Sequence, residues 1–180
     1  MTDLRAEIDE LRREVRGLKD RQSILDCVSN YCRGLDRCDA EILGGAYHAG
    51  AVDRHGPFYG SRDEFVPWAI DLCRPFPVTH HSLTTHTCEI DGDDAYAESY
   101  CIFFAVLPDG KKLGAGAARY IDQLERRDGV WAVVARCEVM DCGFELDRSE
   151  LFSGAWVEVK AKPNREDISY QRPLRVPRPL

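Results

Sequence analysis

The sequence predicts an α+β domain in which helices pack on one face of a curved, mainly antiparallel sheet. Through most of the first 75 positions, apolar residues recur at helical spacing. From about position 78 they alternate with polar residues over four long segments, which is typical of strands. Helices first and strands second favour a layered architecture with the helices gathered on one side of the sheet.

Length and composition indicate one domain. The 180 residues, 44% of them apolar, can enclose a single core but are too few for two ordinary domains. We expect this domain over residues 1–160 and, because of its prolines and arginines, an extended strap or mobile tail over 161–180.

The charge and the cysteines exclude several classes of function. A net charge of −7 without a basic stripe disfavours binding to nucleic acid. No apolar run approaches the roughly 20 residues that cross a bilayer, and the charged N-terminus does not resemble a secretory signal. Eight cysteines without a C-x-x-C pair are typical of buried thiols rather than a disulfide framework. We therefore expect a cytoplasmic protein with no membrane contact.

The first element is an amphipathic helix over about residues 1–20. Its apolar positions alternate spacings of four and three, and charged residues fill the other faces. A second helical stretch continues an apolar face as far as Asp36. Two interpretations of the first apolar stripe stay open: docking on the protein's own core, or a short contact between chains. The stripe consists of Leu4, Ile8, Leu11, Val15 and Leu18.

The middle of the chain contains shorter elements. We expect a short helix over about 40–47 and a strand or hairpin over 51–60, where a Gly-Pro pair interrupts the alternation. The segment from Ser61 to Glu64 resembles a capping box, which predicts a helix through Leu72 that ends before Pro75.

Four long strands should follow, over 78–91, 95–107, 113–127 and about 131–147. Asp-Gly and Pro-Asp-Gly turn signals separate them, so neighbouring strands should pair as an antiparallel meander. Side chains alternate across a strand, and therefore His80 and His81 must point to opposite faces. In the second long strand we place the bulky face on the concave side of the sheet, where helices closing over it would leave room for a ligand. That face holds Tyr96, Tyr100, Ile102, Phe104 and Val106.

Several of these segments resemble the SnoaL-like family, which belongs to the nuclear-transport-factor-like superfamily. The resemblance covers about residues 5–145 and rests on the heptad-bearing N-terminus and three further segments. These are Tyr31 with Asp36 five residues on, Thr79-His80-His81 before Glu89-Ile-Asp-Gly-Asp, and Ala118-Arg-Tyr-Ile-Asp-Gln-Leu-Glu-Arg-Arg-Asp-Gly-Val-Trp131. The resemblance implies a cone-shaped barrel, a strongly curved sheet with helices over its concave face. Enzymes of the superfamily include scytalone dehydratase, bile-acid 7α-dehydratase and hexachlorocyclohexane dehydrochlorinase.

The resemblance also implies a site. By position, Asp36 and His81 match the family's carboxylate-histidine pair, and Tyr31 and Arg136 match further polar positions. Where some relatives carry a second polar catalytic group, around Phe104, this chain has a hydrocarbon ring. We add two aromatic residues to the matched pocket-lining positions, and the candidate substrate-binding residues are then Ile102, Phe104, Tyr120, Trp68 and Tyr59.

These residue types fit acid–base chemistry. An imidazole can remove a proton next to a carbonyl and pass it to a leaving hydroxyl, and a carboxylate can hold the ring and stabilise its charged form. His81 would be the base and Asp36 its partner, while Tyr31 would donate a hydrogen bond to a substrate oxygen. Arg136, within an apolar run, either balances charge on an enolate or forms a structural salt bridge.

We therefore expect a lyase or isomerase acting on a small apolar cyclic compound, such as a steroid, a polyketide or an aromatic-degradation intermediate. We expect no metal and no cofactor, because neither zinc-ligand spacing nor a glycine-rich nucleotide loop is present. The alternative is a non-catalytic member: a small-molecule-binding domain or the small subunit of a ring-hydroxylating oxygenase.

The sequence also favours a homo-oligomer. An open curved sheet leaves an outer apolar face that needs a cover, and we assign Val133, Ala135 and Cys137 to it. The resemblance implies dimers or trimers, and its dehydratase branch favours a trimer.

Overall fold

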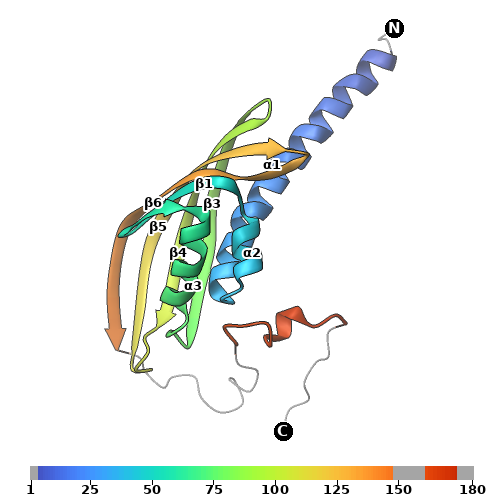
Figure 1. The fold of residues 1–180 in the computed structure, drawn as a ribbon. Coiled ribbons are helices and arrows are strands. Elements are labelled where there is room, and N and C mark those ends of the chain that lie inside the picture. The colour runs from blue at the N-terminus through green and yellow to red at the C-terminus, as the bar shows by residue number, and fades with distance from the viewer. Residues whose placement is uncertain (1–3, 148–160, 174–180) are drawn as a thin grey trace.

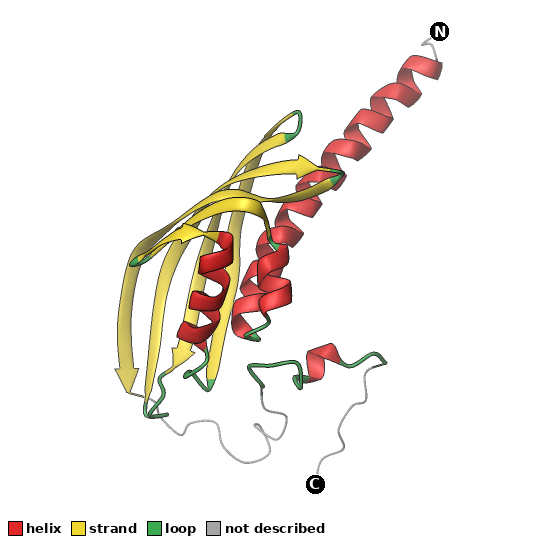
Figure 2. Ribbon diagram, in the orientation of Figure 1, coloured by secondary structure: helices red, strands yellow, loops and turns green. Residues whose placement is uncertain are grey.

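The computed structural model describes residues 4–147 and 161–173. Three helices lie on one side of a strongly curved sheet of six strands, as Figures 1 and 2 show. The predicted α+β class is thus confirmed. The expected domain end over 148–160 and the last part of the tail, 174–180, lie outside the described residues.

The helices begin and end where the local sequence indicates. The two expected N-terminal stretches form one continuous helix, α1 (Leu4–Asp36). The side chain of Asp39 accepts hydrogen bonds from two backbone N–H groups at the start of α2 (Ala40–Gly45). The predicted capping box between Ser61 and Glu64 opens α3 (Arg62–Cys73).

A close approach between α1 and α2 fixes the end of α1. A Cβ atom on Gly34 would lie 2.6 Å from the backbone nitrogen of Leu43, so a larger residue would force the two helices apart. Glycine at this position allows the chain to turn sharply after Asp36.

The strands form one sheet in the order β2-β1-β6-β5-β4-β3. The four long strands pair antiparallel between neighbours, as the turn signals predict. The hairpin of the first two strands joins β6 in parallel, a pairing between segments far apart in sequence. The strands are β1 (Tyr47–His55), β2 (Phe58–Ser61), β3 (Val78–Asp91), β4 (Asp94–Val106), β5 (Lys112–Arg127) and β6 (Val130–Asp147).

The core lies between the helices and the concave face of the sheet, and aromatic rings fill its centre. Tyr31 of α1 is fully buried, lies parallel to Phe65 of α3 and meets the ring of Tyr120 edge-on with centroids 5.2 Å apart. Edge-to-face and offset ring pairs of this kind stabilise a core beyond their buried area.

The bulky face of β4 points outward, which corrects the expected assignment of faces. Ile102 and Phe104 are each 41% exposed, whereas Cys101 on the opposite face is buried. The small side chains of β4 face inward, toward the core. These small inward residues are Ala95, Ala97, Ser99 and Cys101.

A register shift also changes the outer face of β6. Leu124 pairs with Val133 and Gln123 with Ala135, so Val134 is an extra residue in its strand. Val133 is therefore fully buried in the core, against expectation, while Ala135 and Cys137 are exposed as predicted.

Residues 161–173 run across the end of α1 and the start of α2. Tyr170 donates a hydrogen bond to Asp39 (2.8 Å), and Arg165 forms an ion pair with the same carboxylate (2.8 Å). A 3₁₀ turn at Ile168–Tyr170 corrects the expectation that this segment contains no helix. This part of the C-terminal segment is a strap that packs next to the loop after Asp36.

No helix within residues 4–147 and 161–173 is long and apolar enough to cross a membrane.

Candidate active site

The end of α1 and the start of β3 bring Asp36 and His81 together. Nδ1 of the His81 ring lies 2.6 Å from Oδ1 of Asp36, and the backbone N–H of His81 donates to Oδ2 (3.0 Å). Both carboxylate oxygens are thus engaged by one residue, which fixes the position of the ring and its orientation. The two residues come from elements 45 positions apart that only the fold brings together.

The pair is largely enclosed. Side-chain exposure is 15% for His81 and 10% for Asp36. Burial by itself lowers the pKa of His81, but the hydrogen bond and the charge of Asp36 outweigh it, so that the pKa is raised above its usual value. The carboxylate therefore favours the charged imidazolium, as a general base requires once it has accepted a proton.

One ring nitrogen of His81 remains for a substrate. Nδ1 faces Asp36, and within residues 4–147 and 161–173 no hydrogen bond or ion pair to Nε2 is present. Phe103 lies beside the ring with centroids 6.1 Å apart. Gly116, its partner on β5, leaves the space that this ring needs, because a Cβ there would lie 2.6 Å from Phe103.

A second polar chain starts at Tyr31 and runs through His55 of β1 to Glu138 of β6. The Tyr31 hydroxyl lies 3.3 Å from Nδ1 of His55, and Nε2 of His55 lies 3.2 Å from Oε1 of Glu138. Burial, reinforced by the charges of Arg136 and His81, lowers the pKa of His55 to about 3. His55 is therefore neutral, and the Tyr31 hydroxyl can donate to one ring nitrogen while the other donates to Glu138.

Glu138 links this chain to the His81 pair electrostatically. Burial raises the pKa of Glu138, although the positive charge of His81 opposes that rise. In turn, the negative charge of Glu138 contributes to the raised pKa of His81. Asp36 and Glu138 thus raise the pKa of His81, while the charge of His81 lowers the pKa values of His55 and Glu138. Charge coupling of this kind is typical of functional sites.

Tyr31 and Arg136 are both buried, and each has a polar partner within the protein. Tyr31 is fully buried, and its hydroxyl lies 3.3 Å from Nδ1 of His55. Arg136 forms two hydrogen bonds with Asp122 (2.6 and 2.7 Å), and its guanidinium lies 3.9 Å from the centre of the Tyr31 ring. A fully buried guanidinium needs such a partner, and the structure therefore favours the salt-bridge alternative.

The candidate substrate-binding residues divide into two groups. Tyr120 is buried within 6.4 Å of the His55 ring, measured between centroids, and Trp68 lies 6.3 Å from that ring by the same measure. Tyr59 is 73% exposed. Ile102 and Phe104 lie on the outer face of β4, opposite to Phe103, and Phe104 pairs with His80 rather than with His81.

The sequence patterns place neither His55 nor Glu138 nor Phe103 in the site. The alternation Ala51, Asp53, His55 could have placed this histidine on the inner face of its strand, but nothing in the sequence indicates the parallel pairing that brings it to β6. Phe103 follows from the register, because it pairs directly with His81.

Two further features concern metal ligands and surface grooves. Within residues 4–147 and 161–173, no group of three or more His, Cys, Asp or Glu side chains has a geometry that could hold a metal ion. Two surface grooves, of about 1250 and 470 Å³, are lined by residues other than His81 and Asp36.

Comparison with known proteins gives the same fold. The model of the SnoaL-like domain matches residues 16–137. A type 2 hexachlorocyclohexane dehydrochlorinase, LinA, superposes with a TM-score of 0.71 at 22% identity, over 78% of this chain and 97% of the other. The LinA-type3 enzyme from Novosphingobium barchaimii gives 0.70 at 20% identity over 78% and 99%. A protein from Novosphingobium aromaticivorans, provisionally named a scytalone dehydratase, gives 0.65 at 18% identity over 74% and 90%.

These likenesses are to the fold, because every identity is below 25%. No curated protein matches the chain at a significant level. The chain folds as a small α+β protein in which a carboxylate and an imidazole are held together in a largely enclosed position. The chain belongs to the SnoaL-like family, whose model matches two thirds of its length.

Proposed function

We propose that the protein is an acid–base lyase or isomerase that acts on a small apolar cyclic compound without a cofactor. The observation that carries this proposal is the 2.6 Å contact between His81 and Asp36, with the second carboxylate oxygen held by the backbone of His81. A pair with both oxygens engaged is oriented more strictly than a chance surface contact, which leaves Nε2 as the reactive atom.

In the proposed reaction, Nε2 of neutral His81 accepts a proton from a carbon next to an activating group. Asp36 stabilises the imidazolium that results. The same imidazolium then returns the proton, either to a leaving group in an elimination or to another carbon in a double-bond shift. A positioned base of this kind typically contributes about 10² to 10⁴ to the rate.

Glu138 and His55 supply the polar side of the site in this proposal. Their side chains are 9% and 16% exposed, so each presents an edge that a bound molecule could reach. Tyr31 and Arg136 act through them. The Tyr31 hydroxyl hydrogen-bonds to His55, and the Arg136 guanidinium packs on the face of the Tyr31 ring. Both are positioning residues.

The apolar character of the substrate follows from the rings near the two histidines. Phe103 lies beside His81, and Trp68 lies beside His55. Aromatic walls with a few polar groups are typical of sites for small apolar ligands. Family membership and the fold likeness to a dehydrochlorinase support the same class of chemistry.

Proton exchange tests the proposal with a panel of compounds, before the natural substrate has been identified. Cyclic ketones and hydroxyketones with acidic C–H groups, from steroid and polyaromatic series, would be incubated with the protein in D₂O and followed by NMR. We expect exchange or elimination with at least one series, and a loss of at least about 100-fold in His81→Ala.

His80→Ala is the matched control, because His80 is exposed on the other face of β3 and bonds to Ser82. This variant should retain the wild-type rate. Binding of a compound without exchange in the wild type would instead support the non-catalytic alternative. Equal rates in His81→Ala and the wild type would exclude His81 as the base.

A further inference from the structure

The N-terminal part of α1 projects from the body of the protein. Every residue from 4 to 16 is exposed, on all faces of the helix. Figure 1 shows this part of α1 extending beyond the sheet. Contact with the body begins at Asp20, which accepts hydrogen bonds from Arg126 and from the Trp131 indole. An isolated helical segment of this length is marginal in water, so a partner would stabilise it.

The apolar stripe of this segment is not docked on the core. This excludes the first of the two interpretations left open by the sequence, and the contact between chains remains. The stripe residues are between 40% and 69% exposed. The residues that face the body, Asp20, Ile24 and Cys27, lie on the other side of the helix, roughly 160° round its axis at about 100° per residue. Helix α1 therefore has two faces: one packs on the body, and the other is the seam formed by Leu4, Ile8, Leu11, Val15 and Leu18.

The residue types of the seam point to a two-stranded partner. Spacings of four and three make Ile8 and Val15 the a positions of a heptad and the three leucines the d positions. In parallel coiled coils, β-branched residues at a with leucine at d favour dimers. The pattern continues through Gln22 at a and Leu25 at d, which gives about three heptads.

The charges beside the seam fix the orientation of the two helices. In a parallel pair, each g position faces the e position five residues later in the partner. Glu7 then meets Arg12 of a second copy, and Glu14 meets Lys19. An antiparallel pair would instead bring e to e and g to g. Glutamates would then face glutamates and basic residues would face each other.

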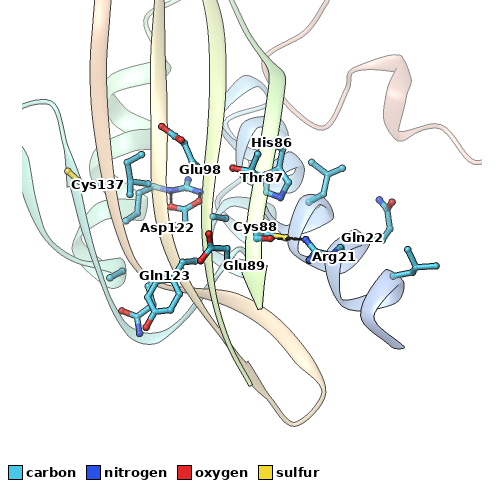
Figure 3. A pocket seen from close by; sticks show the side chains of 17 residues that line it. Arg21, Gln22, His86, Thr87, Cys88, Glu89, Glu98, Asp122, Gln123 and Cys137 are labelled. Carbon is cyan, nitrogen blue, oxygen red and sulfur yellow. Dashed lines mark hydrogen bonds and ion pairs between the residues drawn. The ribbon is translucent and has the colours of Figure 1, made fainter. Parts of the chain in front are cut away.

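The body of the protein leaves room for the partner helix. A groove of about 1250 Å³ runs beside the lower half of the seam and is lined by Leu18, Gln22 and Leu25 on one side. Figure 3 shows Arg21 of α1 reaching to β3 on the opposite side, where it donates a hydrogen bond to the backbone oxygen of Cys88. The groove shares Leu18, Gln22 and Leu25 with the seam, so this part of the seam faces open space beside the body.

We propose that α1 pairs in parallel with α1 of a second copy of this chain, through a coiled coil over about residues 4–25. This contact uses a surface that the acid–base site does not share. The seam begins before the segment that the family model matches, residues 16–137.

Sedimentation equilibrium of the full chain tests the proposal. Leu11→Glu/Val15→Glu places four carboxylates in the seam of a pair and should halve the molecular mass of the wild-type assembly. Ala6→Glu/Arg13→Ala is the control, because it changes the net charge equally at f positions, away from the seam. It should keep the wild-type mass. Circular dichroism checks that all three proteins are folded. Equal masses for all three would overturn the proposal.

Cross-linking tests the orientation. Under mild oxidation, Leu4→Cys should form a disulfide between position 4 of two chains, identified by peptide mass spectrometry among the links that the eight native cysteines could form. Ala6→Cys, on the outer side of the helix, should not. A link from position 4 to a residue near the other end of the seam would refute the parallel arrangement, as would the absence of any link from that position.

Discussion

Replacing Asp36 with asparagine is the sharpest test of the site. The asparagine oxygen can still accept the hydrogen bond from the backbone N–H of His81, which the carboxylate accepts at 3.0 Å. Its amide group would then face Nδ1 of the ring, 2.6 Å from the present Oδ1. Because an amide N–H only donates, Nδ1 must accept, and the ring proton moves to Nε2. The nitrogen that should act as base then has no free lone pair.

The size of the effect follows from the contact that is lost. A hydrogen bond to a charged group contributes about 1.5–3 kcal/mol. At about 1.4 kcal/mol for each factor of ten, Asp36→Asn should lower kcat by roughly 10- to 150-fold through the imidazolium alone. The wrong tautomer would lower it further. Ligand binding should change little, because Asp36 lies behind the ring.

The pH dependence gives an independent readout. Asp36 raises the pKa of His81 against the lowering effect of burial, so the acid limb of the wild-type rate profile should lie above the ordinary value for histidine. In Asp36→Asn this limb should move to lower pH, since only burial and weaker charges remain.

The same shift contributes to stability, with a defined sign. A folded-state pKa above the unfolded one stabilises the protein fully at pH values below about 6.5, and the contribution is lost as pH rises through the raised pKa. The stability difference between wild type and Asp36→Asn should therefore be largest on the acid side. If this variant kept both the wild-type rate and the wild-type pH profile, Asp36 would have no part in the chemistry of His81.

Two further predictions concern the neighbours of the pair. Glu138→Gln should move the acid limb of the rate profile to lower pH, because the negative charge of Glu138 helps raise the pKa of His81; a limb that stays in place or moves to higher pH would contradict this electrostatic coupling. Arg136→Met should lower the free energy of unfolding by about 3–5 kcal/mol, measured with urea, because it leaves the buried Asp122 carboxylate without a cation. Arg136→Met/Asp122→Leu should recover much of that loss, and a double variant as unstable as the single one would show that the ion pair is not the cause.

Local patterns gave most of the fold. The four long strands lie within one residue of the expected bounds at every end, because turns with Asp-Gly signals separate alternating segments. The capping box at Ser61 located α3 in the same way. Such features depend on neighbours in sequence, and they can be recognised without knowing what packs against them.

Pairings between distant segments could not be predicted, and the errors are concentrated there. The parallel pairing of β1 with β6 brings His55 close to Glu138. No local sequence pattern predicts this pairing. Because Val134 is an extra residue in β6, the side chains before it point to the opposite face from the one that simple alternation predicts. Val133 therefore lies in the core.

Residue types and their spacing were enough to establish the order of the elements, the seam on α1 and, through the resemblance to a family, the pairing of Asp36 with His81. Three other features became clear from the folded chain alone: which face of β4 points inward, that Tyr31 and Arg136 are both buried, and that His55 and Glu138 lie close together. The physical reason is that burial and charge interactions depend on what lies across the core, and that is set by packing between segments far apart in the chain.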